Sequence, residues 1–194
     1  MALIAHILTR IPLRLLLALT IALMATAVKA MWRRCSPKLR ARLAQCMMVG
    51  ASSGLLATTG YDLTKFVLSR SEAFSYNPFE VIRVFGALLA GPSAPAAAIF
   101  AVGSAFHILN GICFGTAFCL LFGPRGVAAG IAWAIFLETF QLTLYPGWLD
   151  IRAYQEFAQV SALSHLAYGS ILGWCCQRGL RWRGVKPLQG LGSV

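Results

Sequence analysis

Acidic residues are scarce in this sequence. Of 194 residues, 6 are Asp or Glu and 17 are Lys or Arg, and charged residues together make up only 12%. Hydrophobic residues make up 58%, whereas soluble domains contain about 45–50% apolar residues. This balance excludes a disordered chain and an ordinary soluble enzyme. The apolar residues also form continuous stretches instead of alternating with polar ones, which excludes an outer-membrane β-barrel.

Short metal and redox motifs are absent from the sequence as well. None of the six cysteines belongs to a C-x-x-C pair, which excludes a zinc ribbon and a thioredoxin-like site. No H-x-x-x-H or H-E-x-x-H pair occurs. Four cysteines lie inside apolar runs, where a thiol behaves as a small hydrophobic group. Cys35 lies in a basic loop that we expect to face the reducing cytoplasm, so the sequence predicts no disulfide bond.

The fold class that remains is all-α, a polytopic transmembrane helical bundle of four to five spans with a short interfacial helix. About 20 apolar residues suffice to cross a bilayer. Asn77, Pro78 and Glu80 are typical of a helix start, and the helix that follows is too short to span. We predict a single domain over 1–183, a disordered tail over 184–194, an interfacial helix over 78–90, and spans at about 11–31, 43–61, 96–122, 127–145 and 158–177.

The first apolar stretch has three interpretations. Residues 15–28 form an uncharged run that follows basic residues, as in the core of a signal peptide. Cleavage after this run would leave Arg33 and Arg34 close to the new N-terminus, where strong positive charge resists translocation. We therefore prefer an uncleaved span over 11–31. The third interpretation is a helix that lies in the membrane interface, which would leave four spans.

Basic residues gather in two blocks that contain no acid. The loop 29–42 holds six of them, and the second block follows the last predicted span. Because Lys and Arg accumulate on the cytoplasmic side of membrane proteins, both blocks and the C-terminus are expected to face the cytoplasm. We expect them to attract anionic lipid headgroups. Their position beside apolar stretches argues against a nucleic-acid partner.

Three ionisable residues lie within the predicted spans: His107, Glu138 and His165. Such groups are costly inside a membrane, so they need partners. Each belongs to a stripe of small residues at four-residue spacing, which is typical of a helix-packing face. We expect them to point into the outer half of the bundle and the three spans that carry them to form its tight core. The stripes are Gly103, His107, Gly111 and Gly115; Gly126, Gly130, Ala134 and Glu138; and Ser161, His165, Gly169 and Gly173.

Polar residues lie about one helical turn from these three, on or beside the same faces: Asn110, Gln141 and Tyr168. The six residues together form a candidate ligand or proton site. Three interpretations stay open. The first is a structural hydrogen-bond network in which Glu138 pairs with a histidine, and the second is a pocket for a proton, an ion or a small ligand. The third is a metal site formed by the two histidines and Glu138, because this donor set suits iron, copper or zinc.

Residues 103–180 also carry a pattern found in a known group of proteins. His107 lies near Gly111 in a Gly-rich helix, a second Gly-rich helix ends at Tyr145-Pro146, and Ser164-His165 opens the last helix. This pattern resembles the uncharacterised small bacterial inner-membrane proteins of the YagU type. The resemblance implies a multi-pass protein of the bacterial inner membrane.

The segments outside the predicted spans are too short to form a catalytic domain. We therefore predict a non-enzymatic membrane protein, a small transporter-like or accessory subunit with a polar His/Glu site in the outer half of the bundle and no cofactor. Its expected partners are the lipid bilayer and either another membrane protein or a second copy of the chain. The alternative is an intramembrane enzyme or metal-binding protein that uses the same His/Glu cluster.

Overall fold

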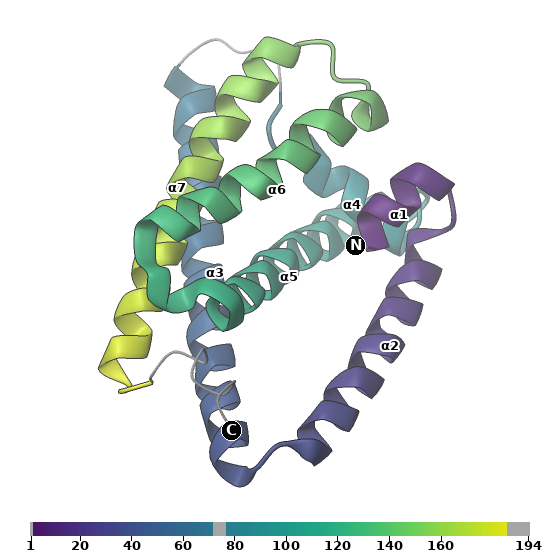
Figure 1. Cartoon of the computed structure of the whole chain (residues 1–194). Coiled ribbons are helices and arrows are strands. Elements are labelled where there is room, and N and C mark those ends of the chain that lie inside the picture. The colour runs from purple at the N-terminus through teal and green to yellow at the C-terminus, as the bar shows by residue number, and fades with distance from the viewer. Residues whose placement is uncertain (1, 72–76, 186–194) are drawn as a thin grey trace.

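The computed structural model describes residues 2–71 and 77–185. These residues form an all-α bundle (Figure 1). The elements in chain order are α1 (Ala2–Thr9), α2 (Leu13–Arg34), α3 (Pro37–Ser71), α4 (Glu80–Ala90), α5 (Ala96–Phe122), the 3₁₀ turn η1 (Gly123–Arg125), α6 (Gly126–Leu149) and α7 (Tyr154–Trp182).

Glycines let α3 and α5 pack backbone against backbone. A Cβ placed on Gly54 would lie 2.5 Å from the carbonyl oxygen of Gly111, and one on Gly115 would lie 2.7 Å from the carbonyl oxygen of Gly50. No side chain fits at such distances, so the two helices cross at their small residues. The facing positions advance in four-residue steps along both helices, in opposite directions.

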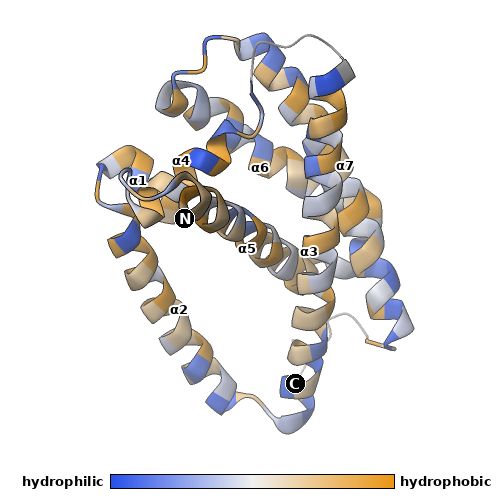
Figure 2. Ribbon diagram, turned by 180° about the vertical axis from the view of Figure 1, so that it is seen from behind, coloured by the Kyte–Doolittle hydropathy of each residue, from blue (hydrophilic) through white to orange (hydrophobic). Residues whose placement is uncertain are grey.

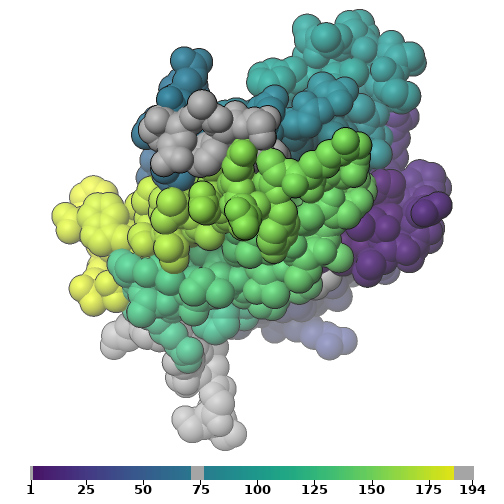
Figure 3. Space-filling model, turned by 90° about the horizontal axis from the view of Figure 1, so that it is seen from above, coloured from purple at the N-terminus to yellow at the C-terminus, as the bar shows by residue number. Residues whose placement is uncertain are grey.

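The helices α6 and α7 form a second close pair. A Cβ on Gly169 would lie 2.5 Å from the carbonyl oxygen of Gly130, and one on Gly173 would lie 2.5 Å from that of Gly126. Figure 3 shows the two helices side by side along one face of the molecule. Because α7 also packs against α3, the helices are arranged in the order α5, α3, α7, α6.

This order corrects the predicted tight core. The stripes of α6 and α7 face each other as expected, but the stripe of α5 packs against α3 and, at its outer end, against α4. A Cβ on Gly103 would lie 2.9 Å from the carbonyl carbon of Ile82 in α4. The small residues of α6 are already covered by Gly169 and Gly173 of α7, whereas α3 presents Gly50, Gly54 and Thr58 to the stripe of α5.

Several helix boundaries differ from the predicted ones. Helix α5 matches its predicted bounds. Helix α3 extends past both ends of the predicted span 43–61, from Pro37 to Ser71, which gives a helix of 35 residues and about 52 Å. No glycine or proline interrupts residues 62–71. The helix α7 is also longer than the predicted span 158–177 at both ends, and α2 lies two to three residues further along the chain than the predicted 11–31.

The predicted end of α6 and the predicted start of α4 were both wrong. Helix α6 runs through Pro146, where we expected it to end, because the proline removes one hydrogen bond only three residues before the helix finishes at Leu149. Helix α4 begins at Glu80 instead of residue 78, because the Asn77 side chain accepts a hydrogen bond from the Phe79 N–H (3.1 Å) in a turn ahead of the helix.

The N-terminal end of the chain forms an additional helix, and the structure describes only the first part of the predicted C-terminal tail. A short helix, α1, precedes α2 and was not expected; the chain reverses between them at Arg10, which has a φ of 59°. Of the predicted disordered tail, residues 186–194 lie outside the described residues. Val185 is partly buried against the core cluster that includes Leu180.

Helix α2 stands away from the bundle over most of its length. It contacts α1 and α4 near its own start, and every residue over 21–34 is exposed. Figure 2 shows α2 and α5 as largely hydrophobic, with hydrophilic residues gathered towards the ends of the bundle. In the described part of the chain, two stretches are long and apolar enough to cross a membrane: Leu13–Arg34, at a position where signal sequences also occur, and Ala96–Leu149, which η1 divides into α5 and α6.

Candidate functional site

Glu138 of α6 and His165 of α7 form a buried ion pair or hydrogen bond. Glu138 Oε2 lies 2.6 Å from His165 Nδ1, and the two residues are 6% and 8% exposed. Their meeting follows from the close contact of Gly130 with Gly169. One further four-residue step along each helix leads to Ala134 and His165, and the turn after Ala134 carries Glu138.

Neighbouring polar groups orient this pair. Ser161 Oγ donates a hydrogen bond to Glu138 Oε2 at 2.8 Å, and Gln141 Nε2 donates to Ser161 Oγ at 2.9 Å. His165 Nδ1 also lies 3.1 Å from the carbonyl oxygen of Ser161. Because Nδ1 faces two acceptors, we assign its hydrogen to this nitrogen. The hydrogen bonds on the carboxylate are thus all directed at one of its two oxygens.

The second oxygen of Glu138 differs from the first. Among the described residues, Oε1 is buried and accepts no hydrogen bond. Leaving a buried polar atom unsatisfied costs about 1–3 kcal/mol, and more for a charged group. Most buried polar atoms in folded proteins are therefore paired, and an unpaired one calls for an explanation. A proton, or a ligand that donates a hydrogen bond, would find an open acceptor at this atom.

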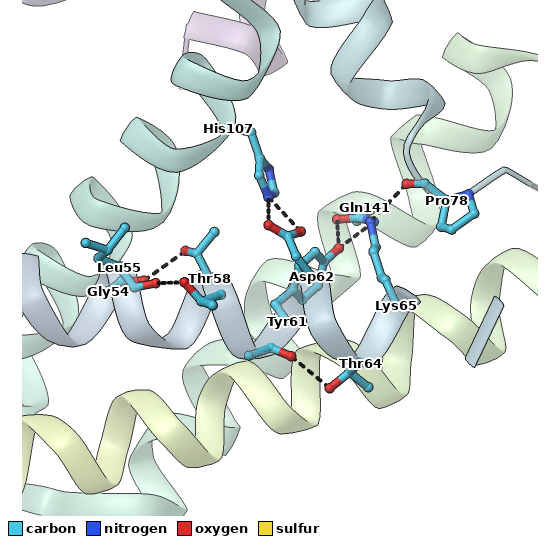
Figure 4. A network of polar contacts seen from close by, with 12 residues as sticks. Gly54, Leu55, Thr58, Tyr61, Asp62, Thr64, Lys65, Pro78, His107 and Gln141 are labelled. Carbon is cyan, nitrogen blue, oxygen red and sulfur yellow. Dashed lines mark hydrogen bonds and ion pairs between the residues drawn. The ribbon is translucent and has the colours of Figure 1, made fainter. Parts of the chain in front are cut away.

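Tyr61 of α3 joins the network from a third helix. Its hydroxyl accepts a hydrogen bond from Gln141 Nε2 at 3.3 Å, and its ring packs edge-on against the His165 ring, with the centroids 4.9 Å apart. The Lys65 ammonium lies 4.5 Å from the centre of the Tyr61 ring and donates to the carbonyl oxygen of Pro78 at 3.4 Å. Figure 4 shows Tyr61, Lys65 and Gln141 together.

His107 of α5 pairs with Asp62 of α3 and not with Glu138. His107 Nε2 lies 2.9 and 3.1 Å from the two carboxylate oxygens of Asp62 (Figure 4). The register of the two helices explains this partner. Thr58 packs against Gly111, and one four-residue step further along each helix brings Asp62 opposite His107. The expectation that one cluster would hold all three ionisable residues is therefore corrected to two acid–histidine pairs.

The remaining predicted site residues are distributed as follows. Gln141 belongs to the Glu138 network. Tyr168 lies beside Tyr61, with ring centroids 6.4 Å apart, but its hydroxyl donates to the carbonyl oxygen of Gly111 at 3.4 Å and so ties α7 to α5. Asn110 is half-buried and lies outside both acid–histidine pairs.

A metal site of the predicted kind does not form in the part of the chain that the structure describes. No group of three or more His, Cys, Asp or Glu side chains is placed there to hold a metal ion. His107 is bound to a carboxylate on a different helix from Glu138, so the predicted ligands do not converge. The chemistry available to this arrangement is hydrogen bonding and proton exchange at carboxylates and imidazoles.

Sequence reasoning missed Tyr61, Asp62 and Lys65 as members of the site. A signal for Asp62 was present, because it continues a stripe of small residues on α3 at four-residue spacing, after Gly54 and Thr58. Tyr61 follows Gly60 and carries no comparable mark. Lys65 is only 3% exposed, which is rare for a lysine, and nothing in the sequence around it predicts that burial.

Comparisons with known proteins leave the chain without an assigned family. No family model, no curated protein and no solved structure matches it. The resemblance to the YagU-type proteins therefore stays a prediction, and the two acid–histidine pairs are the features from which a function can be inferred.

Proposed function

We propose that the chain is a multi-spanning membrane protein in which α2, α3, α5, α6 and α7 cross the bilayer. The exposed apolar surface of α2 and the apolar length of α5 and α6 support this proposal. In water, an apolar helix without protein cover would be unfavourable by about 25 cal/mol for each Å² of apolar surface left exposed. In a bilayer the same surface meets lipid.

Hydroxyl groups on the helices are satisfied in the way that a membrane location requires. Inside a membrane, Ser and Thr hydroxyls need a partner because no water is available. Along α3, Thr59 donates to the carbonyl oxygen of Leu55, four residues earlier, at 3.1 Å although the residue is exposed. The same four-residue bond recurs at exposed or half-buried hydroxyls of the other long helices: Thr26, Thr116, Thr139 and Thr143.

The placement of basic residues supports an orientation. The α2–α3 connection and the end of α7 lie towards the lower side of Figure 1, whereas the α6–α7 connection lies at the top. The two basic blocks thus share one side of the bundle. Under the positive-inside rule this side would face the cytoplasm. We therefore propose, in line with the resemblance to the YagU type, a location in the bacterial inner membrane with the C-terminus inside.

Within this membrane bundle we infer that the Glu138–His165 pair binds and releases a proton, as in a small transporter-like or accessory subunit. The observation that carries the inference is the unpaired, buried Oε1 of Glu138 beside a fully engaged Oε2. Ionisable groups in the membrane interior commonly serve proton or ion pathways. A purely structural pair would gain stability from a donor at both oxygens, and this one lacks a described donor at Oε1.

Infrared spectroscopy of the protein in lipid nanodiscs tests the proposal. As the pH is lowered, the wild type should gain absorption from a protonated carboxyl group, and the part due to Glu138 should be absent in E138Q. Asp150→Asn is the matched control, because Asp150 is exposed in the α6–α7 connection and Asn tolerates its left-handed backbone (φ 51°). If the spectra of wild type and E138Q respond identically to pH, the proposed proton site does not exist.

A further inference from the structure

The two acid–histidine pairs differ in how far they are exposed at the surface of the bundle. The side chains of Asp62 and His107 are 32% and 17% exposed. Those of Glu138 and His165 are 8% and 11% exposed. Asp62 lies just beyond the predicted span 43–61, in the part of α3 that continues to Ser71. We therefore take its exposed surface to face water at the membrane interface, so that a proton from water reaches the Asp62–His107 pair more easily than the Glu138–His165 pair.

Tyr61 lies against both pairs. It precedes Asp62 in the chain, and its ring centroid is 6.2 Å from that of His107 and 4.9 Å from that of His165. Its hydroxyl is bonded to Gln141, which bonds the Ser161 hydroxyl that contacts Glu138. Because its ring packs beside both imidazoles, Tyr61 is a structural link between the exposed pair and the buried one.

The charged and titratable surroundings of this region come from four helices. On α4, Arg83 is exposed and bound to Glu80, so it does not enter the region. Lys65 of α3 lies over the Tyr61 ring and donates to the carbonyl oxygen of Pro78. The groups that face one another here are Tyr61, Asp62 and Lys65 of α3, His107 of α5, Glu138 of α6, and His165 and Tyr168 of α7.

We propose that the Asp62–His107 pair is the loading site through which protons from water reach the buried Glu138–His165 pair, past Tyr61. This inference rests on the proposed function of Glu138 as a proton site. The step moves only a proton: water gives one to the Asp62–His107 pair, and that pair loses it when the Glu138–His165 pair gains one. No bond between heavy atoms forms or breaks, and no oxidant or second substrate is needed.

A rate measurement separates loading from binding. After a sudden drop in pH, the carboxyl absorption assigned to Glu138 is followed over time in nanodiscs. Asp62→Asn removes the exposed proton acceptor but keeps a side chain that can hydrogen-bond His107. We expect D62N to reach the same final absorption as the wild type, but at least about tenfold more slowly, because a positioned acid or base speeds proton transfer by about 10²–10⁴-fold. Asp62→Glu should restore most of the rate.

The outcomes distinguish this inference from the proposed function. A Glu138 signal that D62N reaches as fast as the wild type would show that protons enter elsewhere, and the loading site would be refuted. The complete absence of a Glu138 signal in the wild type would instead refute the proton site itself. A lower final signal in D62N, restored in D62E, would show that Asp62 acts on the binding equilibrium and would also overturn a role in loading alone. Asp150→Asn should leave both the rate and the final signal unchanged.

Discussion

Gly169 is the position at which the packing of α6 and α7 can be tested most sharply. A methyl group there would lie 2.5 Å from the carbonyl oxygen of Gly130 and 2.8 Å from the Cβ of Ala134. Ordinary contact begins near 3.4 Å, so Gly169→Ala requires the two helices to move apart by about 1 Å. A gap of that size forfeits about a quarter to a half of the dispersion energy of the atoms along it.

The expected cost corresponds to a measurable drop in melting temperature. Overpacking a close contact costs about 1–3 kcal/mol, and 1 kcal/mol lowers the melting temperature of a chain of this size by about 2–4 °C. We therefore expect G169A to melt about 2–12 °C below the wild type in detergent. It should also weaken the pH-dependent signal of Glu138, because the same separation lengthens the contact with His165.

The matched control is Gly147→Ala, on α6. Apart from its chain neighbours and the adjacent helix backbone, no described atom lies within 4 Å of a Cβ at Gly147. The substitution meets no clash, so it should leave stability unchanged or raise it by up to about 1 kcal/mol, because helices favour alanine over glycine. Equal melting temperatures for G169A and G147A would refute the close packing of the two stripes, and with it the helix register that brings Glu138 to His165.

Two further predictions concern Tyr61 and the orientation in the membrane. Tyr61→Phe keeps the ring against His165 but removes the hydroxyl that Gln141 contacts, so thermal unfolding should show a loss of about 0.5–1.5 kcal/mol; an unchanged stability would argue that this hydrogen bond does not form. Cys35, in the basic α2–α3 connection, should react with a membrane-impermeant thiol reagent only after cells are opened, whereas a cysteine introduced at exposed Arg152 should react in intact cells. Labelling of Cys35 from outside would reverse the proposed orientation.

The sequence predicts the helical class and much of the site because both depend on regular spacing. Helix α5 has its predicted bounds, since Pro95 and the glycine and proline of η1 delimit it. The contact between Glu138 and a histidine follows from the small-residue stripes of α6 and α7. Their glycines pack together and fix how the two helices align along their length. These features depend on short-range sequence patterns, because residues three or four positions apart lie on the same face of a helix.

The pairing of the helices could not be predicted in the same way. Small-residue stripes indicate that a helix packs closely, but they do not say against which neighbour. The stripe of α5 could pair with α3, α6 or α7, and the choice of α3 decided that His107 would meet Asp62. The burial of Lys65 likewise depends on the carbonyl oxygen of Pro78, which comes from a different element.

Proton flux through sealed vesicles tests most directly whether the proton that Glu138 binds and releases crosses the membrane, as a transporter-like role requires. The protein is reconstituted into vesicles that contain a pH-sensitive dye, and an inward-directed electrical potential is imposed with a potassium gradient and a potassium ionophore. We predict that vesicles with the wild-type protein acidify faster than protein-free vesicles, and that E138Q abolishes the difference while D150N preserves it. Equal acidification by wild type and E138Q would contradict the proposed role of Glu138.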